Sequence, residues 1–149
     1  MYRRTHIAIG TALGFYFIPY VTDPLVFFPL VVFASLLPDA DSAFSYLGKK
    51  PVFKPIQWVS NHRGIFHTYT MCILLSILLA LFIPIAALPF FVGYSFHLFA
   101  DSFTVNGITP FWPLKHKSKG LVRSGGPIDK ALFVVFVIIS VFLFVSLFF

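Results

Sequence analysis

The sequence predicts an all-α protein, an integral membrane helical bundle of about five transmembrane or partly re-entrant helices. Two observations support this class. The chain of 149 residues is 58% hydrophobic and only 11% charged, which is more apolar than a soluble domain requires. Its mean hydropathy is +0.91. We expect one membrane-embedded domain over residues 1–149, in which residues 1–127 form the bundle and residues 128–149 form a C-terminal anchor helix.

Five apolar runs, bounded by proline, aspartate, glycine or basic residues, account for the predicted helices. They cover residues 4–21, 24–37, 65–84, 89–103 and 128–149. The third and fifth runs have a comfortable spanning length, whereas the second and fourth are short. At ~1.5 Å per residue the second run reaches about 21 Å, against a hydrocarbon core of about 30 Å. We therefore expect the short helices either to extend into loops or to end below the membrane surface.

The basic residues predict the orientation of these helices. Lysine and arginine occur before the first run, in the 38–64 connection and in or beside the 104–127 connection, but are absent from residues 22–23 and 85–88. With five crossings, all 11 basic residues fall on one side, which the positive-inside rule makes cytoplasmic. The N-terminus is then cytoplasmic, on a first helix that we expect to be uncleaved because no signal-peptidase motif follows it. Contact with anionic lipid explains the net charge of +6, so we predict no nucleic-acid partner.

Seven ionisable residues at the ends of the apolar runs form the candidate site. They are His6, Asp39, Asp41, His62, His67, His97 and Asp101. A charged group beside hydrocarbon costs several kcal/mol unless it is paired or coordinated, so such residues mark function by default. The predicted topology places all seven on the cytoplasmic side, although they are scattered along the chain. Since imidazole and carboxylate groups bind metal ions, the sequence predicts a metal site at that membrane face.

The spacing of these residues gives each a candidate role and an alternative. His97 and Asp101 are four apart, so on a helix they share one face as ligands of one ion would; a capping Asp and a structural histidine are the alternative. His62 and His67 diverge by roughly 140° on a helix, so we expect His67 to be a ligand and His62 to contact substrate or support the site. A structural role for His62 is the alternative.

The remaining three candidates also have two interpretations. Asp39 and Asp41 follow Pro38, and one of them could simply cap the next turn. Two such caps are not expected, because neighbouring anions near a lipid surface repel one another unless a cation lies between them. His6, beside Arg3 and Arg4, could equally be an interfacial histidine.

The sequence blocks around these residues resemble the LexA-regulated inner-membrane metal-dependent hydrolases, the YdjM-like family. The blocks are Thr5-His6, Leu36-Leu37-Pro38-Asp39-Ala40-Asp41, His62-Arg63-Gly64-Ile65-Phe66-His67-Thr68 and Gly93-Tyr94 through His97-Leu98-Phe99-Ala100-Asp101. The resemblance continues through Thr104, Gly107 and Thr109-Pro110-Phe111-Trp112-Pro113. It implies a multi-pass protein of the prokaryotic plasma (inner) membrane with hydrolase activity.

More remotely, the layout is similar to zinc-dependent phospholipase C and P1 nuclease. This likeness implies five metal ligands, namely His6, Asp39, His67, His97 and Asp101. Asp101 would be the candidate bridge between two metals. The further ligands of a three-zinc site have no clear counterpart, since Asp129 is the only nearby carboxylate. We therefore expect one or two divalent ions, with zinc as the expected metal.

The expected function is a membrane-bound metal-dependent hydrolase that cleaves a phosphoester of a lipid or polyprenyl phosphate at the cytoplasmic face. Zinc lowers the pKa of its bound water to about 7 and polarises a phosphoryl oxygen. Arg63 is the candidate phosphate contact, although it could instead pair with lipid phosphate, and Asp41 is the candidate general base or orienting residue. Membrane lipid is thus the expected substrate, and no oligomeric state is predicted.

Two other functions use the same residues. A transporter could pass metal ions or protons along the His and Asp groups, but it would need polar groups at several depths rather than at one face. A small non-catalytic membrane protein would use its histidines only for packing. The non-catalytic protein would contain no metal after careful purification, whereas the hydrolase would contain it.

Overall fold

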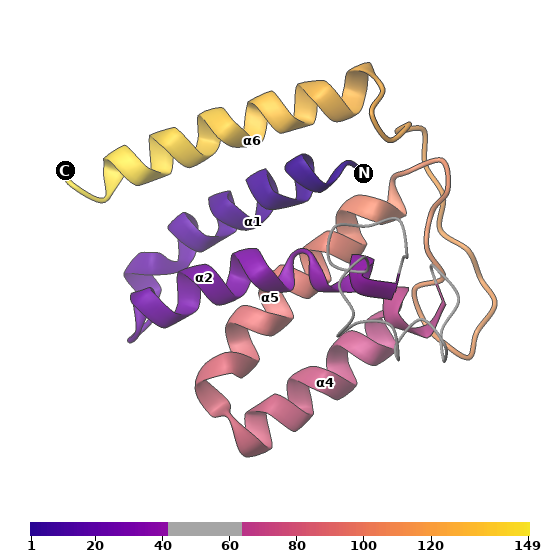
Figure 1. Cartoon of the computed structure of the whole chain (residues 1–149), viewed down its shortest axis with the longest axis horizontal. Coiled ribbons are helices and arrows are strands. Elements are labelled where there is room, and N and C mark those ends of the chain that lie inside the picture. Colours follow the sequence, from indigo (N-terminus) through magenta and orange to yellow (C-terminus); the bar gives the residue numbers. More distant parts are fainter. Residues whose placement is uncertain (42–63) are drawn as a thin grey trace.

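The computed structural model describes residues 1–41 and 64–149 of the chain. This described part contains five α-helices and no strand, so the predicted all-α class is confirmed (Figure 1). The helices are α1 (Arg3–Phe17), α2 (Pro24–Ala34), α4 (Tyr69–Phe82), α5 (Pro84–Ser102) and α6 (Pro127–Ser146). Three 3₁₀ turns accompany them, namely η1 (Ile18–Tyr20), η2 (Leu37–Asp41) and η4 (Ile65–His67).

The predicted lengths of the third and fourth helices are wrong. Helix α4 has 14 residues rather than a full spanning length, because Thr68 caps its start and the preceding residues form η4. Helix α5 has 19 residues rather than being short, because it begins at Pro84 and continues through Pro89. Proline fits the first turn of a helix, where its missing N–H is not needed, so Pro84 is the true start. The connection between the two helices is Ile83 alone rather than residues 85–88.

The described helices alternate in direction, so the N-terminus, η2, η4 and residues 103–126 lie at one end of the bundle (Figure 1). We call this the polar end: it comprises the N-terminus, η2, η4 and residues 103–126. Helices α1 and α6 both begin there and run side by side, and the C-terminus lies at the opposite end. Every lysine and arginine in the described ranges belongs to the polar end or to the first turn of α1 or α6.

Glycine residues allow α1 and α5 to approach α2 closely. A Cβ atom on Gly93 would lie 2.3 Å from the carbonyl oxygen of Val31, and one on Gly10 would lie 2.7 Å from Oγ of Ser35. Small residues at helix contacts are typical of membrane bundles, where backbones associate by close packing. The consequence is local: α5 lies near enough to α2 for His97, one turn after Gly93, to contact the end of α2.

Helix α6 is the one helix in the described part that is long and apolar enough to cross a membrane unaided, with 20 residues and a mean hydropathy of 2.6. Helices α2 and α4 are apolar but shorter. Large apolar side chains are widely exposed, among them Leu25 at 92%, Phe82 at 79% and Phe142 at 71%. Extensive exposure of large apolar side chains is typical of proteins that contact a membrane or another protein.

Asp129 joins the start of α6 to the start of α1. Its buried carboxylate accepts hydrogen bonds from the backbone N–H of Tyr2 at 3.0 Å, the hydroxyl of Thr5 at 2.6 Å and the backbone N–H of Gly125 at 2.6 Å. A negative charge at this position also suits the N-terminus of a helix. Helix α6 is therefore attached to the residues around His6 in addition to any role as an anchor.

We predict that Asp129→Ala lowers the free energy of unfolding by about 1.5–3 kcal/mol, because it removes a charged acceptor from three buried or half-buried donors. Chemical unfolding of the detergent-solubilised protein measures this loss. Asp23→Ala, which removes an exposed carboxylate at the opposite end, is the matched control and should change stability by less than about 0.5 kcal/mol. Equal losses for the two variants would contradict a structural role for Asp129.

Candidate metal centre

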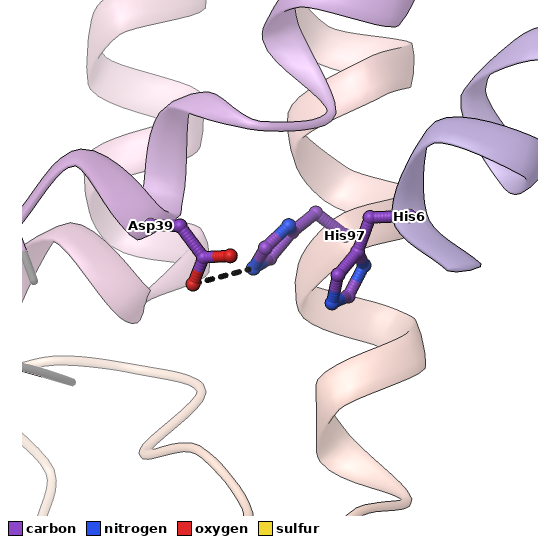
Figure 2. Close-up of side chains that lie close together, drawn as sticks. All are labelled: His6, Asp39 and His97. Carbon is purple, nitrogen blue, oxygen red and sulfur yellow. Dashed lines mark ion pairs between the residues drawn. The ribbon is translucent and has the colours of Figure 1, made fainter. Parts of the chain in front are cut away.

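The structure brings the five residues proposed as metal ligands together at the polar end. They come from four elements: His6 from α1, Asp39 from η2, His67 from η4, and His97 and Asp101 from the last turns of α5. Two groups have ligand atoms within 4.8 Å of one another, one formed by His6, Asp39 and His97 and the other by His67, His97 and Asp101. Figure 2 shows the first group, with the imidazole of His97 between the other two side chains.

The distances between these groups match ligands of a shared ion better than direct hydrogen bonds. Nε2 of His67 and Nε2 of His97 lie 3.7 Å and 3.9 Å from Oδ1 of Asp39. Nε2 of His97 lies 4.0 Å from Oδ2 of Asp101, and Nε2 of His6 lies 3.3 Å from Oδ1 of the same residue. Hydrogen bonds to nitrogen seldom exceed about 3.2 Å. Two ligands of a tetrahedral ion with bonds of about 2.0–2.1 Å stand about 3.3 Å apart.

A backbone hydrogen bond fixes the orientation of His97. Its Nδ1 lies 2.7 Å from the carbonyl oxygen of Ser35. A carbonyl can only accept, so Nδ1 carries the proton and Nε2 of the neutral ring presents a lone pair. That lone pair is on the side of Asp39 and Asp101. Metal-binding histidines characteristically donate their other ring N–H to such an outer partner.

Two of the imidazoles contain buried nitrogens that lack hydrogen bonds. Nε2 of His97 and both ring nitrogens of His6 have no hydrogen-bond partner among the described residues. The two rings are stacked, with centroids 3.9 Å apart and planes 17° apart. An unsatisfied buried polar atom costs about 1–3 kcal/mol, so native structures rarely retain several in one place. The donor set therefore fits a divalent metal, which would be coordinated by Nε2 of His97 and one ring nitrogen of His6.

The two carboxylates supply the negative charge of the centre. Burial by itself raises the pKa of Asp39, but the neighbouring imidazoles of His67, His97 and His6 outweigh that effect and hold its pKa below the usual range. Asp39 is thus ionised at neutral pH. Asp101 makes an ion pair with the α-ammonium group of Met1, and its second oxygen is the one nearest to His97. Three imidazoles and two carboxylates form a donor set that suits zinc and related transition metals.

Several residues that support this centre were not identified from the sequence. Ser35 contributes a backbone carbonyl, which no side-chain pattern reveals. Tyr94 donates its hydroxyl to the carbonyl of Phe66 and so holds η4 against α5. Thr68 accepts a hydrogen bond from the N–H of Met71 and thereby begins α4 immediately after His67. Thr68 and Tyr94 both belong to the sequence blocks that resemble the YdjM-like family, but nothing in those blocks indicates these hydrogen bonds.

The side chains of the three candidate catalytic residues lie outside the part of the chain that the structure describes. His62 and Arg63 lie outside the described residues, and Asp41 is the last residue of η2, with a side chain outside the described part. Their proposed roles stay predictions. Asp129, the one carboxylate considered for a third metal, is engaged by Tyr2, Thr5 and Gly125 and belongs to neither candidate group. The structure thus brings five candidate ligands together, and the expectation of one or two ions stays a prediction.

Comparison with known proteins places the chain in a family. It is 35% identical over 96 residues to the inner membrane protein YdjM of Escherichia coli strain K12, and equally to that of Shigella flexneri. These alignments cover 58% of this chain and 49% of each relative, so the match spans about half the length of those curated proteins. The chain is also 29% identical over 121 residues to the protein YvsG of Bacillus subtilis strain 168, covering 76% of this chain and 74% of that one.

No solved structure matches the chain. The profile of a family described as YdjM inner membrane protein matches residues 1–148, which is nearly the whole sequence. A family of inner membrane proteins agrees with the exposed apolar surface of the helices. The chain belongs to the YdjM inner membrane protein family.

Proposed function

We propose that this protein is a membrane-bound metal-dependent hydrolase that cleaves a phosphoester of a lipid or polyprenyl phosphate at the cytoplasmic face of the inner membrane. One observation carries the proposal. At the polar end, three buried or nearly buried imidazoles and two carboxylates face one another at 3.3–4.0 Å, and Nε2 of His97 has no hydrogen-bond partner in the described part. Packing alone gives no reason to collect such groups in an apolar chain.

The metal would be held by His6, Asp39, His67, His97 and Asp101. Both candidate groups include His97, whose Nδ1 is already used, so its single free nitrogen favours one principal ion. Asp101 has one oxygen near His6 and the other near His97, which makes it the residue able to serve a second ion. When bound, a divalent ion of this kind supplies a Lewis acid and lowers the pKa of bound water.

The remaining roles extend this proposal to residues known from the sequence alone. Arg63 would bind the phosphate group of the substrate, His62 would contact the substrate, and Asp41 would accept a proton from the attacking water or orient it. Their proximity along the chain to Asp39 and His67 supports these assignments. The remote likeness to zinc-dependent phospholipase C and P1 nuclease supports phosphoester cleavage as the reaction.

A membrane lipid is the proposed substrate because of where the centre lies. The described helices alternate in direction (Figure 1). The described basic residues all lie at the polar end or in the first turn of α1 or α6. Five crossings with this end in the cytoplasm would satisfy the positive-inside rule and put the metal centre near the lipid headgroups. Phosphates of lipids in the inner leaflet would then be the nearest substrates.

We predict that the wild-type protein, purified without chelators, contains at least one transition metal ion per chain. His97→Ala should weaken metal binding by more than about 10-fold, since even residues that only support ligands contribute 10–100-fold. Elemental analysis measures the metal, and a melting curve confirms that the variant is folded. His116→Ala removes an exposed histidine of the α5–α6 connection and is the matched control. Equally little metal in all three proteins would refute the metal centre.

We predict that the metal-loaded protein releases phosphate, headgroup or diacylglycerol from bacterial inner-membrane lipids or polyprenyl phosphates. Chromatography of radiolabelled lipid detects each product. Chelation or His97→Ala should lower the rate roughly 100-fold, while His116→Ala should leave it unchanged. A protein that binds metal but releases no product from any of these lipids would contradict hydrolysis of lipid phosphoesters without contradicting the metal centre.

We predict that the polar end faces the cytoplasm. In a Cys72→Ala background, Thr22→Cys places a thiol in the α1–α2 connection and Lys117→Cys places one at the polar end, both at exposed positions. A membrane-impermeant maleimide should label Thr22→Cys in intact spheroplasts and Lys117→Cys only after permeabilisation. Labelling of both positions from the same side would refute the alternating five-crossing topology.

A further inference from the structure

We propose that the seam between α1 and α6 binds one acyl chain of an anionic membrane phospholipid, whose phosphate group is held by Arg4. This lipid would be a bound component of the protein and distinct from any substrate at the metal centre. His6, which faces the metal centre, follows Arg4 by about 200° around α1. The groove therefore lies on the opposite side of α1 from the candidate ligands, and its occupancy does not depend on the proposed hydrolase activity.

The dimensions of the groove suit a single chain. It has a volume of about 520 Å³ and is bounded by Arg4 to Phe15 of α1 and by Phe133 to Phe144 of α6. Eleven helical steps of ~1.5 Å give it a length of about 16 Å, close to the ~15 Å of hydrocarbon in one leaflet. The volume and length of the groove are sufficient for one extended hydrocarbon chain lying along α1 and α6.

The walls of the groove are hydrocarbon along its length. Ile7, Ala8 and Val137 are typical of its lining. Of its two hydroxyl groups, that of Ser140 is already donated to the carbonyl of Phe136 at 2.7 Å. This leaves Thr11 as the one polar side chain in the interior that has no hydrogen bond in the described part. A polar occupant would therefore lose its hydrogen bonds with water, whereas an acyl chain would lose nothing.

The charge at the mouth of the groove selects the headgroup. The guanidinium of Arg4 lies 5.1 Å from the ring centre of Phe133 and 5.8 Å from that of Tyr2. No carboxylate pairs with it among the described residues, and the nearby Asp129 accepts its hydrogen bonds from other donors. Arginine binds phosphate oxygens in a fork geometry, and both helices begin at this end. The aromatic rings hold the positive charge at the level where an acyl chain would meet its phosphate.

The test uses the full-length protein in zwitterionic nanodiscs that contain trace phosphatidylglycerol or phosphatidylcholine with a photoreactive acyl chain. After illumination, peptide mass spectrometry should locate labels on α1 and α6. The anionic lipid should label these helices about five-fold more than the zwitterionic one, the factor that corresponds to ~1 kcal/mol for one basic residue. Arg4→Gln should remove this preference, whereas Arg123→Gln, which removes an exposed charge of the same end, should preserve it.

Filling the groove tests the acyl chain separately. Val137→Trp and Val141→Trp place bulk in the groove at exposed positions and should lower labelling by both lipids at least three-fold. Ile138→Trp, on the same helix but outside the groove, should not. Equal labelling by the two lipids would overturn the role of Arg4. Labelling unaffected by either tryptophan in the groove, or a cross-link between two copies through α6, would overturn the acyl site. None of these outcomes depends on metal or hydrolysis.

Discussion

The hydrogen bond from Nδ1 of His97 to the carbonyl of Ser35 is the interaction on which the candidate centre depends. It fixes the ring, leaves Nε2 as the available nitrogen and directs it toward both carboxylates. The bond requires α5 to approach the end of α2, which Gly93 allows because any side chain there would collide with the carbonyl of Val31. Gly93 thus allows α5 to pack against α2, and His97, one helical turn later, is oriented by that contact.

The convergence of the five candidate ligands could be predicted from the sequence because ionisable residues are rare in so apolar a chain. The five candidate ligands lie at or near the start or the finish of an apolar run: His6, Asp39, His67, His97 and Asp101. The lysine and arginine residues indicate which of these positions lie on the same side of the membrane. These arguments require no knowledge of helix packing. The opposite directions within the α1–α2 and α4–α5 pairs then follow from the short connections that join them.

Other features were not accessible, for identifiable reasons. Pro89 was interpreted as a helix boundary, although a proline inside a membrane helix is tolerated where packing compensates the lost hydrogen bond. The role of Ser35 depends on a backbone atom. The role of Gly93 depends on its contact with Val31, which lies 62 positions earlier in the sequence. Asp129 was considered only as a possible ligand, since nothing in the sequence indicates that Thr5 and Tyr2 would donate to it.

The position of Asp129 has a consequence for the order in which the protein matures. Helix α1 is synthesised before α6, but the carboxylate that secures its first turn belongs to α6, 124 positions after Thr5. The ribosome must therefore reach α6 before this hydrogen bond beside His6 can form. A nascent polypeptide that still lacks α6 would carry all five candidate ligands without the hydrogen bond that secures the first turn of α1, so the surroundings of His6 are completed after the other candidate ligands have been synthesised.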